Sequence, residues 1–83
     1  MTMTPEMLET VGENLFGAHW IGEMAVRLGV TPRTVRRWHN GEFAISREVE
    51  QALAIIARAR VQETASVLDG LLAAGQDREA GLD

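Results

Sequence analysis

Arginine is the residue type in this sequence best suited to recognising another molecule. All eight basic residues of the 83-residue chain are arginines, and Arg33, Arg36 and Arg37 form the densest group. A guanidinium makes planar, bidentate hydrogen bonds with phosphate oxygens and with the O6 and N7 atoms of guanine. Thr31 and Thr34 lie beside these arginines and add hydroxyls that can bond to phosphate or pack on a thymine methyl.

The positive charge is concentrated in the middle of the chain. The net charge is −4, which by itself disfavours nucleic acid as a partner. Residues 20–60, however, hold seven arginines and four glutamates, whereas residues 1–19 carry −3 and residues 61–83 carry −4. An approaching phosphate responds to charges within a Debye length of ~8–10 Å, so the local basic segment is what it meets. The exclusive use of arginine has a simpler explanation in the composition of the genome.

The chain offers few residues for catalysis or for binding a metal. It contains no cysteine, tyrosine or lysine. Its two histidines, His19 and His39, have no evident third ligand, so we expect neither a metal nor a cofactor. Glu9 and Glu13 lie one helical turn apart, but on a face that we expect to be solvated. We therefore expect a protein that is not an enzyme.

Length and hydropathy restrict the class further. A chain of 83 residues makes one domain at most, and 46% apolar with 24% charged residues is typical of a folded chain. No apolar run approaches the ~20 residues of a membrane span. The N-terminus is acidic and lacks the basic-then-apolar order of a secretory signal. These features predict a cytoplasmic protein.

The sequence predicts helices throughout, because no stretch shows the alternation of a strand. A first helix is expected from its cap at Thr4 to Phe16, with Gly17 at the C-terminal end. A second helix is expected over residues 20–28 and ends at Gly29. The apolar faces that we expect to be buried comprise Met7, Leu8, Val11 and Leu15 in the first helix and Ile21, Met24, Ala25 and Leu28 in the second.

The third helix has the clearest boundaries. Thr31 caps it, Pro32 occupies its first position, and Asn40-Gly41 closes it. Val35 and Trp38 form its apolar side, so the three arginines of this helix are expected to point outward. Both tryptophans of the chain are expected in the core. The alternative for Trp38 is a platform for stacking bases, and the alternative for Trp20 is an exposed position beside a phosphate.

A fourth helix follows a short loop. Phe43 and Ile45 are expected to anchor that loop in the core, and Ser46 caps the helix. The helix is expected over residues 47–74, which is about 42 Å at ~1.5 Å per residue. That length exceeds what the rest of so small a domain can cover. Residues 75–83 are expected to be a disordered acidic tail.

The fourth helix carries two apolar stripes, rotated by roughly 130° on the helical wheel. The first, formed by Val49, Ala52, Leu53 and Ile56, is expected to pack on the preceding helices as far as about residue 57. The second, which we call the seam, comprises Ala54, Ala57, Val61, Ala65, Leu68 and Leu72, spaced like a short coiled coil.

No part of the chain remains to cover the seam, so we expect a partner, and a second copy of the chain is the expected one. The dimerisation segment is then the extension over residues 59–74, with Val61, Ala65, Leu68 and Leu72 as the contacting residues. The alternative is a frayed helix end whose alanines are merely good helix formers.

The segment from Ile21 to Asn40, IGEMAVRLGVTPRTVRRWHN, resembles the helix-turn-helix of bacterial and phage DNA-binding proteins, in particular the lambda repressor/Cro-like group. The match lies in the spacing of small and apolar residues: Ala25, Gly29 four residues later, and Val35 six residues after that. It covers residues 21–40 as a motif and residues 4–58 in architecture. Many members of the group begin this motif with a glutamine that contacts a phosphate, so that contact differs here.

The resemblance implies an all-α, four-helix helix-turn-helix domain over residues 4–58 with an extended C-terminal helix. In such domains the third helix lies in the major groove of double-stranded DNA, with its N-terminal residues facing base edges. The function implied is transcriptional regulation of the repressor type by a dimer, as in small phage or prophage regulators. The DNA-binding residues implied are Thr31, Arg33, Thr34, Arg36, Arg37, Asn40 and Arg47.

Two other functions remain open. The first is a protein-interaction module of the same shape, such as an antitoxin subunit or a phage assembly or adaptor subunit, which the acidic net charge favours modestly. The second is the DNA-recognition subunit of a phage DNA-processing complex, which binds DNA without regulating transcription.

Overall fold

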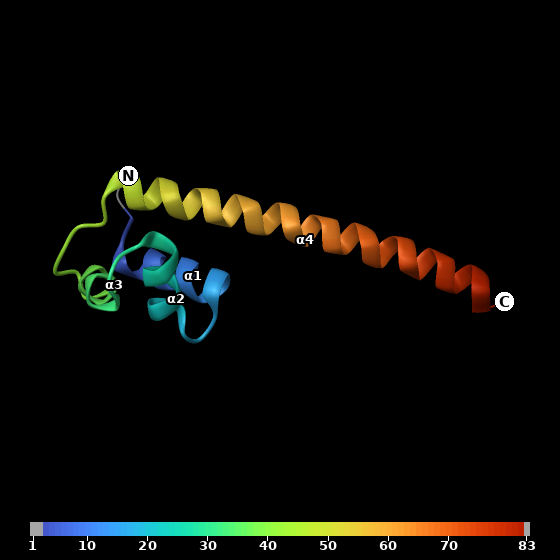
Figure 1. Ribbon diagram of the computed structural model, residues 1–83, viewed down its shortest axis with the longest axis horizontal. Coiled ribbons are helices and arrows are strands. Elements are labelled where there is room, and N and C mark those ends of the chain that lie inside the picture. Colours follow the sequence, from blue (N-terminus) through green and yellow to red (C-terminus); the bar gives the residue numbers. More distant parts are fainter. Residues whose placement is uncertain (1–2, 83) are drawn as a thin grey trace.

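Four helices make up the protein. The structure is a computed structural model that describes the backbone of residues 3–82 and the side chains of residues 3–75. The helices are α1 (Pro5–Phe16), α2 (Trp20–Leu28), α3 (Pro32–His39) and α4 (Arg47–Leu82). The described residues include no strand, which confirms the predicted all-α class. Helices α1–α3 and the first turns of α4 form a head, residues 3–57, from which the rest of α4 projects (Figure 1).

Three of the four helices begin at the capping residues that the sequence predicts. The Met7 N–H donates to the Thr4 hydroxyl (3.1 Å) at the start of α1. The Thr34 N–H donates to the Thr31 hydroxyl (3.3 Å) at the start of α3. Ser46 accepts from a backbone N–H at the start of α4 in the same way (3.3 Å). Each cap satisfies an N–H group that has no partner inside its helix.

Glycines end the first three helices, also as predicted. Gly17, Gly29 and Gly41 all have positive φ angles. Gly29 matters most for the geometry, because its left-handed conformation (φ 72°, ψ 30°) reverses the chain between α2 and α3. In that turn the Val30 N–H donates to the Ala25 carbonyl at 3.0 Å. An L-amino acid with a side chain adopts this conformation only at a cost of roughly 1–2 kcal/mol.

A single apolar core holds α1–α3 and the start of α4 together. Its buried residues are Leu8, Trp20, Met24, Ala25, Val35, Trp38, Ile45 and Leu53. Both tryptophans therefore lie in the core, as expected. Four other expected core residues are only half-buried: Val11, Leu15, Ile21 and Leu28. Two are exposed, since Met7 is 46% exposed and Phe43 is 50% exposed. Met7 lies next to Leu8, the fully buried residue of this part of α1.

Gly12 determines how closely α1 and α2 pack. It is buried within α1, and a Cβ added there would overlap the indole of Trp20. A glycine in a helix interior destabilises the helix by roughly 0.5–1 kcal/mol relative to alanine. Here the missing side chain makes room for the largest residue of the core, which the sequence pattern does not reveal.

Helix α4 packs apolar side chains on the head only through its first turns. Beyond them, the Arg60 guanidinium donates to the Leu15 carbonyl of α1 at 3.2 Å. Leu53 is buried, and Val49, Ala52, Ile56 and Ala57 are half-buried. From Arg58 to Gly75 every residue is exposed, which confirms that packing ends near residue 57.

The expected end of this helix is wrong, because α4 continues past Ala74 to Leu82. Gly75 does not adopt the positive φ of a helix-ending glycine, and no proline follows it. The segment expected to be a disordered tail thus continues the helix up to residue 82, and Asp83 lies outside the described residues. None of the helices in the described part of the chain combines the length and hydropathy needed to cross a membrane.

Candidate nucleic-acid interface

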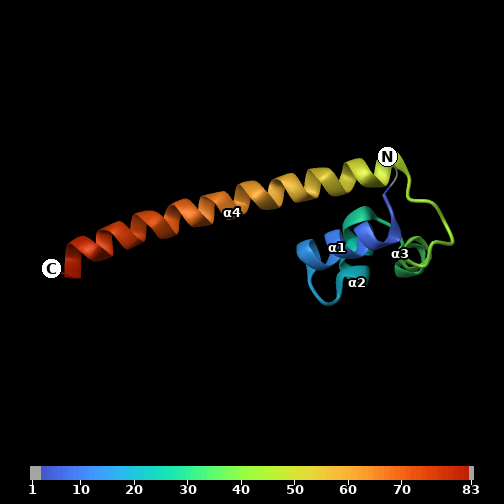
Figure 2. The same cartoon turned by 180° about the vertical axis from the view of Figure 1, so that it is seen from behind.

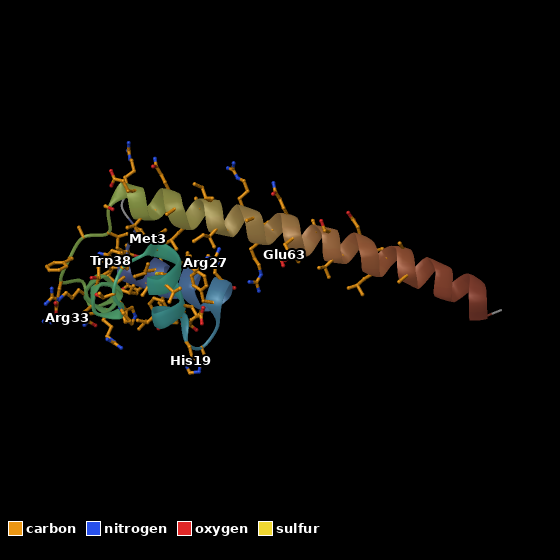
Figure 3. The ribbon with its side chains drawn as sticks, in the orientation of Figure 1. Met3, His19, Arg27, Arg33, Trp38 and Glu63 are labelled. Carbon is orange, nitrogen blue, oxygen red and sulfur yellow. The ribbon has the colours of Figure 1, made fainter. Side chains whose placement is uncertain are left out.

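Helix α3 has one face in the core and one face in solvent. Val35 is 0% exposed and Trp38 is 8% exposed, so the helix cannot rotate without emptying the core. Arg33 and Arg36 are exposed on the opposite side, as predicted. Figure 3 shows Arg33 at the outer end of the head, with Trp38 pointing inward. The core thus fixes the direction in which two guanidinium groups leave the molecule.

Arg37 is less free than the sequence suggests. Its side chain is only 35% exposed, and its Nε lies 3.8 Å from a carboxylate oxygen of Glu42. Its guanidinium also stacks over the Phe43 ring, 5.1 Å from the centroid. The reason is local: the N–H groups of Glu42 and Phe43 both donate to the Arg37 carbonyl, which folds the loop back over the end of α3. Arg37 is therefore half-buried and engaged with the loop, unlike the exposed Arg33 and Arg36.

The threonines at the start of α3 bond to each other. The hydroxyls of Thr31 and Thr34 are 3.1 Å apart, and Thr31 also caps the helix. Thr31 is exposed and Thr34 is half-buried. Their hydroxyls are thus oriented by the helix start, and Thr31 retains an exposed edge toward solvent.

Asn40 lies one turn after Arg36 on the same side of α3, whereas Arg47 belongs to α4. Asn40 is exposed at the C-terminal end of α3, where its N–H donates to the Arg36 carbonyl at 2.8 Å. Arg47 is exposed in the first turn of α4, at the same end of the molecule as α3 (Figure 1). No contact joins Arg47 to the arginines of α3 among the described side chains.

A shallow hollow lies between the starts of α2 and α3. Its lining residues are Ala18, His19, Trp20, Ile21, Gly22, Pro32 and Arg36. Helix α2 begins at His19 without a side-chain cap. Its first N–H groups have no partner inside the helix, and the helix dipole makes this end positive. Arg36 thus borders a surface that already favours an anion.

The sequence does not predict this hollow. Ile21 is expected in the buried face of the second helix, but its side chain is half-buried and contributes to the wall. The available signal was the residue at 19, because histidine is a poor cap compared with the threonines and serine that begin the other helices.

The histidines belong to different surroundings. The ring of His39 packs edge-on against Trp20, with centroids 5.1 Å apart, and its Nε2 lies 3.8 Å from a Glu9 carboxylate oxygen. His19 is exposed beside the hollow. Across the described residues, no three His, Asp or Glu side chains cluster closely enough to hold a metal ion.

The predicted dimerisation residues are all accessible. Val61 is 66% exposed, Leu68 is 53% exposed and Leu72 is 58% exposed, and Ala65 lies between them in the exposed class. The seam therefore runs along the projecting part of α4, away from the arginines of α3.

Comparison of the chain with protein-family models, with curated proteins and with solved structures gives no match.

Proposed function

We propose that the protein binds double-stranded DNA sequence-specifically through α3 and regulates transcription as a repressor-type dimer. The observation that carries this proposal is the pair of exposed arginines, Arg33 and Arg36, on a helix whose other face is locked in the core. A short helix held in one orientation, with guanidinium groups on its outer face, suits insertion into a major groove.

The proposed base contacts belong to Arg33 and Arg36. Each can pair bidentately with the O6 and N7 atoms of guanine, and a good pair discriminates between bases by ~1–3 kcal/mol. Thr31 adds a hydroxyl at the leading end of the helix. Thr34 is half-buried, so its contact is limited to the backbone side of the groove.

The proposed phosphate contacts surround α3. The hollow at the start of α2 offers free N–H groups and the flank of Arg36 to one phosphate. Arg47 and Asn40 are proposed to meet the backbone on the other side of the groove. Arg37 takes a supporting part, because it holds Glu42 and Phe43 against α3.

Dimerisation follows from the small size of one module. A single domain of this kind contacts ~600–1,000 Å², which limits both affinity and specificity. A dimer covers two half-sites about 34 Å apart and thereby excludes polymerase from the DNA. The proposed repression is this occlusion, with no cofactor involved.

The test is a selection from a random duplex pool with the wild-type protein and Arg36→Ala in parallel. Arg58→Ala is the matched control, because it removes the same charge from an exposed position on α4. We expect the wild type and Arg58→Ala to enrich one two-fold symmetric motif and Arg36→Ala to lose it. If no protein enriches any sequence at modest salt, the DNA-binding proposal is wrong, and a protein-interaction module takes its place.

A further inference from the structure

The projecting part of α4 exposes more apolar surface than the seam residues alone. Leu71 is 65% exposed and Val67 is 57% exposed, next to the exposed Leu68 and Leu72. In both views the helix leaves the head with no other element beside it (Figures 1 and 2). A contiguous apolar surface of this kind marks an interaction site in a water-soluble chain.

The seam continues onto the head as an apolar track. One shallow hollow on α4 lies along Val61, Ala65 and Leu68. A second lies where the seam meets α1, between Val11 and the small residues Ala54 and Ala57. A third follows along α1 beside Val11 and the exposed Met7. Val11 lines both of the last two hollows, and the first follows one turn beyond Ala57 on the same stripe, so we treat the three as one track. The small side chains of the alanines let a helix approach closely there.

We propose that a second copy of the chain docks its α4 antiparallel along this track. In the register that pairs the seam with itself, Val61 lies opposite Leu72 of the second copy, and Ala65 lies opposite Leu68. Each leucine then faces a smaller residue, as in an interdigitated helix interface. Beyond Leu72, the helix of the second copy continues beside Ala57 and Ala54 and along the hollow at Val11.

Charge supports the antiparallel orientation over the parallel one. Arg60 borders the seam at one hollow and Glu50 borders it at the next. A parallel, in-register pair sets Glu50 beside its own copy and Arg60 across from Arg58 of the second copy, because opposite flanks of the seam face each other. Like charges at such positions are destabilising. An antiparallel pair instead sets Arg60 opposite Ala73 of the second copy, so the like charges no longer meet.

The arrangement fixes where the two heads lie. With Val61 opposite Leu72, the two Leu53 positions are separated by about 40 Å along the helix pair at ~1.5 Å per residue. The stripe of α4 that packs on the head is rotated by roughly 130° from the seam. The two-fold axis of the pair is perpendicular to both helices, so both heads lie on the same side of the plane that contains the two helices. This inference does not depend on DNA binding, although the spacing is close to the ~34 Å of one turn of DNA.

Disulfide cross-linking distinguishes the orientations, because the chain has no cysteine. The variants are Val61→Cys and Leu72→Cys, oxidised separately and as a mixture that has been unfolded and refolded together. Identical positions are about 16 Å apart along the antiparallel pair, whereas a disulfide needs Cα atoms within ~7 Å. We expect a covalent dimer in the mixture and none in either variant alone. Cross-linking of either variant with itself overturns the antiparallel arrangement.

Sedimentation without DNA tests the association itself. We expect the wild type to have twice the mass of the chain, and Leu68→Glu to have the mass of one chain with an unchanged helical spectrum. Ile55→Glu is the matched control, since Ile55 is 71% exposed on α4 but lies away from the seam, and it should remain dimeric. A monomeric wild type at the concentrations used for cross-linking overturns the proposal and assigns the track to a different partner.

Discussion

Arg36 is the side chain at which the two proposed kinds of DNA contact meet. It leaves the outer face of α3 and also lines the hollow at the start of α2. One guanidinium can therefore face a base edge while its neighbours, the N–H groups of α2, face a phosphate. Arg37, one residue later, is instead engaged with Glu42 and Phe43. An exposed ion pair of this kind contributes little to stability. The two backbone hydrogen bonds to the Arg37 carbonyl are what hold the loop against α3.

Arg47 provides the sharpest residue-scale prediction for a phosphate contact. We expect Arg47→Ala to weaken binding to all duplexes alike and to lower the slope of log affinity against log salt by about 0.9, the value for one phosphate neutralised. Salt titrations on the selected duplex and on an unrelated duplex measure this. Arg58→Ala should leave the slope unchanged, and a wild-type slope for Arg47→Ala removes this residue from the interface.

Gly12 provides a prediction about packing. We expect Gly12→Ala to lower the free energy of unfolding by about 1–3 kcal/mol, because the added methyl group overlaps the indole of Trp20. Gly70→Ala is the control, since no atom lies within 4 Å of its added Cβ. Urea denaturation should show a lower midpoint for the first variant only. An unchanged or higher midpoint for Gly12→Ala contradicts the close approach of α1 and α2.

At the scale of elements, the turn between α2 and α3 sets the angle at which α3 is presented. Gly29 holds the left-handed conformation in that turn, and Thr31 begins α3 two residues later. The buried Ala25 lets the two helices approach each other, since it is 1% exposed and has only a methyl side chain. The exposed arginines are therefore oriented by residues that they do not touch.

Replacing Gly29 tests this turn. We expect Gly29→Ala to destabilise the protein by roughly 1–2 kcal/mol, which is the cost of the left-handed conformation for an L-residue. Gly22→Ala serves as the control: it lies within α2 at a negative φ and in open space, so it should stabilise the protein by roughly 0.5–1 kcal/mol. Thermal melts of the two variants should shift in opposite directions. A shift in the same direction is inconsistent with the strained turn.

At the scale of the whole molecule, the protein is elongated, with extents of 61 × 24 × 21 Å. The arginines of α3 and the exposed part of the seam lie on different parts of it, on the head and on the projecting helix. The proposed DNA contact and the proposed self-association can therefore be tested by separate substitutions. In the dimer proposed above, each head binds one half-site and α4 sets the distance between them.

The dimer prediction combines both proposals. We expect Leu68→Glu to bind a duplex with a single half-site as tightly as the wild type does. On the complete two-fold site we expect it to bind at least tenfold more weakly, because the second head is no longer held at high effective concentration. Fluorescence anisotropy on the two duplexes measures the difference, with Ile55→Glu as the control. Equal losses on both duplexes mean that the substitution acts on the head and not on the dimer.

The sequence by itself determined where the helices begin, where three of them end and which face of α3 is buried. Caps, the two prolines and the turn glycines act through atoms within a few residues, so their effect can be read along the chain. The same holds for the apolar spacing of Val35 and Trp38 and for the extent of packing along α4.

Only the tertiary structure decided the rest. Gly12 is explained by Trp20 of another helix, and the hollow at α2 needs both α2 and α3 to exist. The continuation of α4 past Gly75 has a local cause, since Gly75 does not adopt a positive φ and no proline follows it. The stacking of Arg37 on Phe43 and the exposure of Met7 and Phe43 also escaped the pattern. These features depend on contacts between segments that are separate in the sequence and meet only in the folded chain. No spacing within a single helix encodes that outcome.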